Sequence, residues 1–212
     1  MKTLRTDEGR EALDWLREER GLSDKVINDF QMGFVPSRVQ HEFAGRIITP
    51  ICDPYGKFIA FSSRHIKNKR SFFHESFEKK FFLYGLHLAK YAMLRQNRAI
   101  LVEGEMDVAF LHSRGFNMTV GVSGSAFTIL QAALLARYCQ EVYIVFDRDE
   151  NKSGQKATDR IMGLVEDGSI YGMKFIPVKL PMGYDPDDFI KEYKAQAFAD
   201  LLKKSKENLL EM

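Results

Sequence analysis

The C-terminal half of the chain alternates short apolar runs with segments of helical periodicity. Strands are predicted at residues 99–102, 118–122, 142–146 and 173–179, with helices near 106–114, 127–138 and 154–166. Continuous β-branched runs of this length are typical of strands buried on both faces. The alternation therefore predicts a parallel sheet with right-handed crossovers.

The N-terminal half follows a different pattern, in which helices precede a hairpin. Apolar spacing predicts a helix over residues 8–20 that ends at Gly21, and Ser23 is placed to cap a second helix. Residues 46–52 and 57–62 are predicted strands, joined by the turn sequence Asp-Pro-Tyr-Gly. Two further helices are predicted at residues 87–96 and 196–210.

These patterns indicate an α/β protein with a boundary near residue 97. We expect a smaller α+β subdomain over residues 1–97, an α/β domain with a parallel sheet and flanking helices over 98–192, and a C-terminal helix over 193–212. With 212 residues and 45% hydrophobic composition, the chain can form one good core or two small ones.

The formal net charge is only +2, but it is unevenly distributed. Residues 57–98 contain ten Lys and Arg against two Glu, whereas residues 103–188 contain thirteen Asp and Glu against eight Lys and Arg. A basic region before an acidic one suits a polyanion held near a metal ion. Two ordinary solvated surfaces are an equally good interpretation of charge alone.

Cysteine content and hydropathy point to a cytoplasmic protein. Cys52 and Cys139 are the only cysteines, too few for a disulfide framework or for a zinc site supplied by this chain. No apolar stretch approaches the ~20 residues that span a bilayer, and the N-terminus has no apolar signal segment. We therefore expect no membrane partner.

Acidic residues follow three of the predicted strands. They are Glu103 and Asp107, Asp147 and Asp149, and Asp185 and Asp187. The carboxyl ends of parallel strands meet at one sheet edge, where carboxylates repel one another unless a cation lies between them. Oxygen ligands of this kind suit Mg²⁺ or Mn²⁺, and phosphoryl transfer is a common use of such a site. Each acidic residue can instead cap a helix. This alternative is strongest for Asp187, which can cap the helix that follows it.

The order of these motifs resembles the TOPRIM domain of DnaG-type primases, topoisomerases and related nucleases. That family has a strand followed by Glu-Gly-x-x-Asp, matched at residues 103–107, and a later strand followed by Asp-x-Asp, matched at 147–149. Residues 122–125 stand where the family has a small-residue loop.

The resemblance continues upstream and is greatest to the DnaG-type primase catalytic core. The matching segments are residues 12–16, 20–23, 33–36, 45–51, 56–64, Lys79 with 83–86, and 180–187. It covers roughly residues 10–195.

This resemblance implies a DNA-dependent RNA polymerase that makes short RNA primers from NTPs on single-stranded DNA. Glu103, Asp147 and Asp149 would be catalytic, with Glu103 as the acid/base near the 3′-oxygen. Two Mg²⁺ or Mn²⁺ ions would be held by the six carboxylates named above. The basic residues expected to contact nucleotides or template are Arg46, Arg64 and Lys79.

The chain departs from the family pattern in three ways. Arg148 replaces the usual Gly between the two aspartates, and the loop after Asp149 is longer than in the family. Neither a zinc-binding module nor a helicase-binding domain is present in the sequence. We therefore expect a separate zinc-binding module and a replicative helicase as partners.

Two alternative functions remain open. A TOPRIM nuclease would use the same carboxylates with water as the nucleophile, although the primase-like hairpin argues against it. A non-catalytic single-stranded nucleic-acid-binding module is favoured if Arg148 and the longer loop spoil the metal site. The phenylalanines at positions 72, 73, 77, 81 and 82 could stack on bases, but packing under a loop is the better interpretation.

Overall fold

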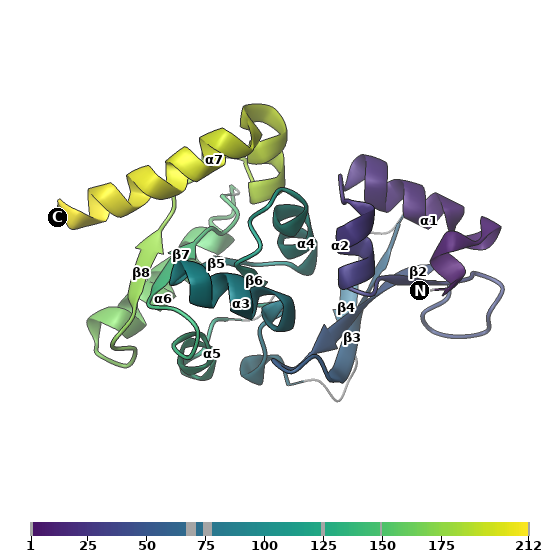
Figure 1. Ribbon diagram of the computed structural model, residues 1–212, viewed down its shortest axis with the longest axis horizontal. Helices are drawn as coiled ribbons and strands as arrows, with labels where there is room; N and C mark the ends of the chain where they lie inside the picture. The colour runs from purple at the N-terminus through teal and green to yellow at the C-terminus, as the bar shows by residue number, and fades with distance from the viewer. Residues whose placement is uncertain (1, 67–70, 74–77, 124–125, 149, 212) are drawn as a thin grey trace. The chain divides into compact units, whose positions relative to one another are not determined.

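The computed structural model describes residues 2–66, 71–73, 78–123, 126–148 and 150–211, and divides the chain into two compact units. The first spans residues 1–78 and the second 79–212 (Figure 1). Helix α3 (Leu86–Gln96) belongs to the second unit and packs on its sheet, whereas the sequence analysis placed it in the N-terminal part. The predicted three-part division stays a prediction about domain organisation.

The first unit combines a helical segment with an antiparallel sheet. Its helical elements are η1 (Lys2–Arg5), η2 (Asp7–Gly9), α1 (Arg10–Asp14), the π-helical η3 (Trp15–Glu19) and α2 (Asp24–Asp29). As predicted, Gly21 follows the first helical segment with φ of 64°, and the Ser23 hydroxyl accepts a hydrogen bond from the Val26 amide at 3.3 Å.

The sheet of the first unit has the order β1-β2-β3-β4. Its strands are β1 (Gly33–Val35), β2 (Arg46–Cys52), β3 (Phe58–His65) and β4 (Ser71–Phe73). The Asp53 carboxylate accepts hydrogen bonds from the amides of Tyr55 and Lys57, which explains the predicted turn between β2 and β3. Strands β1 and β4, of three residues each, were not predicted.

The second unit contains the predicted parallel sheet, in the order β6-β5-β7-β8. Its strands are β5 (Arg98–Val102), β6 (Thr119–Gly121), β7 (Glu141–Ile144) and β8 (Lys174–Pro177). The helical elements are η4 (Lys79–Phe81), α3, α4 (Glu105–Ser113), α5 (Ile129–Leu135), α6 (Ser153–Glu166) and α7 (Pro186–Leu210). The α/β prediction is confirmed, and the central strands β5 and β7 are almost wholly buried.

Helix α7 differs from the predicted final helix. It begins ten residues before Gln196, and Lys194 interrupts it with a non-helical φ of 74° and ψ of 162°. Pro186 stands at its first turn, where a missing amide hydrogen costs nothing. None of the described helices is long and apolar enough to cross a membrane.

Candidate active site

The structure brings Glu103 and Asp147 together at the carboxyl edge of the parallel sheet. Strands β5 and β7 are direct neighbours, and the Val145 amide continues their ladder by donating to the Leu101 carbonyl at 2.9 Å. Just beyond, Glu103 Oε1 accepts a hydrogen bond from the Asp147 amide at 3.3 Å. Both side chains belong to half-buried residues. The site therefore lies just beyond the ends of two buried strands.

Gly154 is a site residue that was not predicted from the sequence. It is buried at the start of α6, where a Cβ atom would lie 2.2 Å from the Asp147 carbonyl oxygen and 2.7 Å from Glu103 Oε1. Real Cβ atoms essentially never come this close to a main-chain atom. Its only sequence signal was a Gly at the beginning of a predicted helix, which says nothing about what it touches.

Asp107 lies at the N-terminus of α4, consistent with the helix predicted near residues 106–114. Its Oδ2 atom accepts a hydrogen bond from the Gly104 amide at 3.1 Å. A Cβ on Gly104 would lie 2.9 Å from the same oxygen, so Gly fits this cap better than a larger residue. A negative side chain at this position also interacts favourably with the positive end of the helix macrodipole.

The third acidic group has two distinct environments. Asp185, not Asp187, caps α7, because Oδ1 of Asp185 accepts a hydrogen bond from the Asp188 amide at 2.6 Å. The alternative interpretation of Asp187 as the cap was therefore wrong. Asp187 is 1% exposed and forms an ion pair with Lys191 at 2.9 Å.

The segment before Asp185 is hydrogen-bonded to the segment that follows β7. The Arg148 amide donates to the Tyr184 carbonyl at 3.0 Å, and the Gly183 amide donates to the Arg148 carbonyl at 2.7 Å. Main-chain hydrogen bonds thus connect the segment of Asp147 to the segment that leads to Asp185. Asp149, the other predicted catalytic aspartate, lies outside the described residues.

The main chain around Lys79 is held by the N-terminus of α5. The buried Gln131 side-chain amide donates to the carbonyls of Lys79 at 3.2 Å and Phe82 at 2.7 Å, and the Thr128 hydroxyl donates to the Lys80 carbonyl at 3.0 Å. Burial lowers the pKa of Lys79, and the negative charge of Glu105 only partly opposes this effect. A cation predicted to contact nucleotides or template therefore lies within electrostatic range of Glu105 in α4.

Arg46 and Arg64 lie on opposite faces of the first unit's sheet. Arg64 is paired with Ile47, so it shares the face of Ile47, whereas neighbouring Arg46 points the other way. The Arg64 guanidinium lies 5.7 Å from the centre of the Trp15 ring, on the helix-covered side. Arg46 donates to the Ser63 hydroxyl at 3.3 Å on the opposite face.

Only part of the phenylalanine cluster is described. Phe81 is 45% exposed and Phe82 is half-buried, so Phe81 does not pack under a loop. Position 77 and the side chains of Phe72 and Phe73 lie outside the described part of the chain.

The donor chemistry of the edge suits a divalent cation, although its full ligand set is not described. Glu103, Asp107 and Asp147 supply oxygen donors from two adjacent strand ends. Among the described residues, no three His, Cys, Asp or Glu side chains form a group that could hold a metal ion. The metal-ligand assignment therefore stays a prediction.

Comparison with known proteins agrees with this architecture. Residues 100–190 match a Toprim-like family, and residues 37–90 match the N-terminal domain of the DNA primase catalytic core. A DNA primase from Aquifex aeolicus is 32% identical over 95% of the chain and 49% of its own length. One from Synechococcus elongatus is 30% identical over 96% of the chain and 35% of its own length.

Solved structures give the same result. A DnaG catalytic core superposes with a TM-score of 0.84 at 27% identity, covering 96% of this chain and 75% of that one. The zinc-binding and RNA polymerase domains of the Aquifex aeolicus primase give 0.82 at 30% identity, covering 96% and 57%. The chain belongs to the DnaG-type primase catalytic-core family.

This DnaG-type chain spans less than half the length of the curated primases cited above. A DnaG catalytic domain bound to single-stranded DNA is also similar, with a TM-score of 0.82 at 26% identity over 96% of this chain and 76% of that one. Membership accounts for the fold and for the order of the acidic groups.

Proposed function

We propose that this chain is the nucleotidyl-transfer core of a primase, joining NTPs into short RNA on a single-stranded DNA template. The observation that carries the proposal is the contact between the Glu103 carboxylate and the Asp147 amide at the ends of β5 and β7. The primase names of the relatives support the same activity. A cytoplasmic location is part of the proposal, because the template would be found there.

In this proposal, carboxylates from all three acidic groups contribute to one site. Glu103, Asp147 and Asp149 would be the catalytic residues. Asp107, Asp185 and Asp187 would be further metal ligands, and we call these six carboxylates the acidic edge. Two Mg²⁺ or Mn²⁺ ions, when bound, would offset charge on the attacking and leaving oxygens. Glu103 would hold the proton of the primer 3′-hydroxyl, positioned by its hydrogen bond to Asp147.

The basic residues would bind the substrates. Lys79 would contact the triphosphate, because it lies near α4 and its ammonium is partly desolvated. Arg46 and Arg64 would bind template phosphates, which makes affinity fall as salt rises. Start-site selection would need a zinc-binding module outside these residues, and a replicative helicase would bring the two together.

Extension of a supplied RNA primer with labelled NTPs on single-stranded DNA tests the proposal. We expect extension by the wild-type protein, and a loss of at least a hundredfold in Glu103→Gln. Glu150→Gln is the matched control, because Glu150 is an exposed acid in the neighbouring loop. Shortened DNA instead of lengthened RNA would favour the nuclease, and neither product would favour the binding module.

Initiation without a primer is a separate measurement. We expect inefficient initiation by this chain alone and a gain when a zinc-binding module is added. Efficient, sequence-specific initiation by the 212-residue chain would contradict the proposed division of labour.

A further inference from the structure

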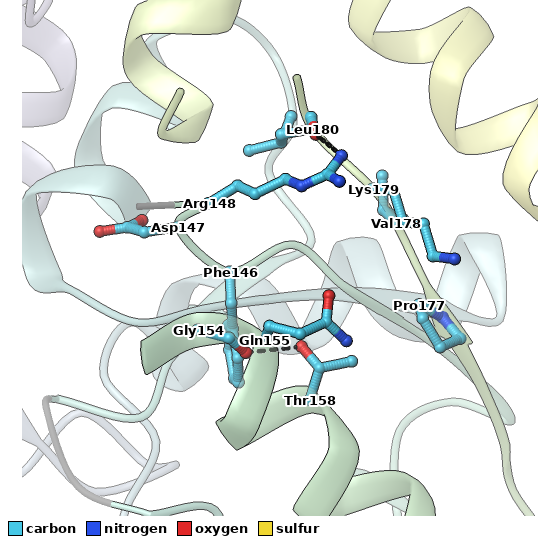
Figure 2. A pocket seen from close by; sticks show the side chains of 10 residues that line it. All are labelled: Phe146, Asp147, Arg148, Gly154, Gln155, Thr158, Pro177, Val178, Lys179 and Leu180. Atoms are coloured by element: carbon cyan, nitrogen blue, oxygen red, sulfur yellow. Dashed lines mark hydrogen bonds between the residues drawn. The ribbon is translucent and has the colours of Figure 1, made fainter. Parts of the chain in front are cut away.

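Arg148 makes three hydrogen bonds to one loop. Two involve its main chain, with Gly183 and Tyr184, and would form with almost any residue at this position. The third needs its long side chain, since Nη1 donates to the Leu180 carbonyl at 2.7 Å (Figure 2). The bonds hold both ends of residues 180–184 against Arg148, four residues beyond the end of β7.

This loop leads directly to Asp185. Leu180 is 1% exposed and fixes the start of the loop, while Gly183 provides a turn with φ of 86°. Asp185 then caps α7 through the Asp188 amide. The place of the Asp185 carboxylate therefore depends on how the loop is held.

The Arg148 guanidinium binds the 180–184 loop and extends away from the adjacent Asp147 carboxylate. Figure 2 shows the side chains of Asp147 and Arg148 extending in opposite directions from neighbouring positions. Arg148 is half-buried in a pocket whose wall includes Leu180 and Thr158. The cation that replaces the family's Gly is thereby directed away from Asp147.

We propose that Arg148 is a positioning residue, which sets the spacing between the Asp147 and Asp185 carboxylates by fixing the intervening loop. The inference rests on the proposed function, because it concerns the geometry of the same acidic edge. It explains how this chain tolerates Arg between two catalytic aspartates.

Replacing Arg148 should change metal affinity in opposite directions, depending on whether the residue acts by positioning Asp185 or only through its charge. A cation near an acidic site repels a divalent metal, so removing its charge alone should tighten metal binding. If Arg148 positions Asp185, removing its side chain should weaken binding instead. Loss of a residue that orients metal ligands typically costs 10–100-fold in affinity.

The test is titration of the full chain with Mn²⁺, the probe, in wild type and Arg148→Met. We expect about tenfold weaker binding in the variant, and faster hydrogen exchange of the Gly183 amide. Lys179→Met is the matched control, because Lys179 is an exposed cation lining the same pocket. It should bind Mn²⁺ as tightly as wild type or more tightly.

Arg148→Lys gives a second variant with the charge and one donor retained, and we expect it to recover part of the affinity. Equal or tighter Mn²⁺ binding by Arg148→Met would overturn the positioning role and leave the proposed function intact. Wild-type protein that neither binds Mn²⁺ nor extends a primer would overturn both.

Discussion

The Glu103 carboxylate accepts a hydrogen bond from the Asp147 amide, 44 residues further along the chain, at 3.3 Å. This contact joins the ends of two parallel strands that are neighbours in space but not in sequence. Gly154 completes the arrangement by lying against both residues. The acidic edge therefore depends on close packing as well as on charge.

Gly154→Ala should damage this edge. The added methyl group would meet the Asp147 carbonyl, a main-chain atom that can give way only if the backbone shifts, so we expect a loss of about 1–3 kcal/mol in unfolding free energy. Primer extension and Mn²⁺ binding should fall with it.

Gly163→Ala is the matched control for Gly154→Ala. Gly163 lies in the same helix, and a Cβ there would have no neighbour within 4 Å. This change should add about 0.5–1 kcal/mol of stability, because Ala is the better helix former. Chemical denaturation of the two variants measures both changes in unfolding free energy. A gain in stability for both variants would show that the close approach at Gly154 is unimportant.

Arg64 and Arg46 should separate stability from DNA binding. Arg64→Ala removes the cation from the Trp15 ring, so we expect it to lose about 0.5–1 kcal/mol of stability and also to bind DNA more weakly. Arg46→Ala should weaken DNA binding with little change in stability. Affinity measured over a range of salt concentrations should show a slope smaller by about one for each variant. Unchanged slopes in both would contradict the template-binding assignment.

Local sequence signals predicted most of the elements but not the contacts between them. The turn at Asp53 and the cap at Ser23 appeared as predicted because both are determined by neighbouring residues. The role of Gly154 depends on two strand ends that meet only in the folded sheet. The opposite placement of Arg46 and Arg64 depends on strand register, which a hairpin sequence does not state directly.

The end of the parallel sheet illustrates the same limit. The Asp-Pro sequence at 185–186 is typical of a helix start, but the final helix was predicted only from residue 196, and Asp187 was the candidate cap. Nothing local distinguishes a capping aspartate from a buried, ion-paired one two residues later. That distinction comes from the packing of α7, which leaves Asp187 only 1% exposed.

Lys79→Met should stabilise the fold while impairing nucleotide binding. Burial lowers the pKa of Lys79, so its charged form is less favourable in the folded state than in the unfolded state. Since the unfolded state then binds more protons, stability should rise with pH as Lys79 loses its proton. We therefore expect a higher melting temperature for the variant at pH 7, with a smaller difference near pH 10.5, the ordinary value for lysine.

The exposed neighbour Lys80 supplies the control for this pH effect. Lys80→Met should change the melting temperature little at either pH, because the Lys80 side chain is already exposed. A lower melting temperature for Lys79→Met at pH 7 would mean that attraction to Glu105 outweighs burial.

Lys194→Gly should increase stability. The backbone of Lys194, with φ of 74° and ψ of 162°, lies in a region that is essentially restricted to glycine and costs other residues about 1–3 kcal/mol. Aromatic packing on both sides of the kink maintains it, since Phe189 lies 4.9 Å from Tyr193 and 6.2 Å from Phe198 between ring centres.

Relief of this strain should exceed the greater chain entropy of Gly in the unfolded state, so we expect a net gain of about 1 kcal/mol. Lys204→Gly is the control, because Lys204 is exposed in the regular part of the same helix and should lose about 1 kcal/mol. Urea denaturation of both variants at matched m-values gives the comparison. A gain in unfolding free energy for Lys194→Gly with a loss for Lys204→Gly would establish that the kink stores strain. Equal losses in both variants would show that Lys194 occupies an ordinary helical position.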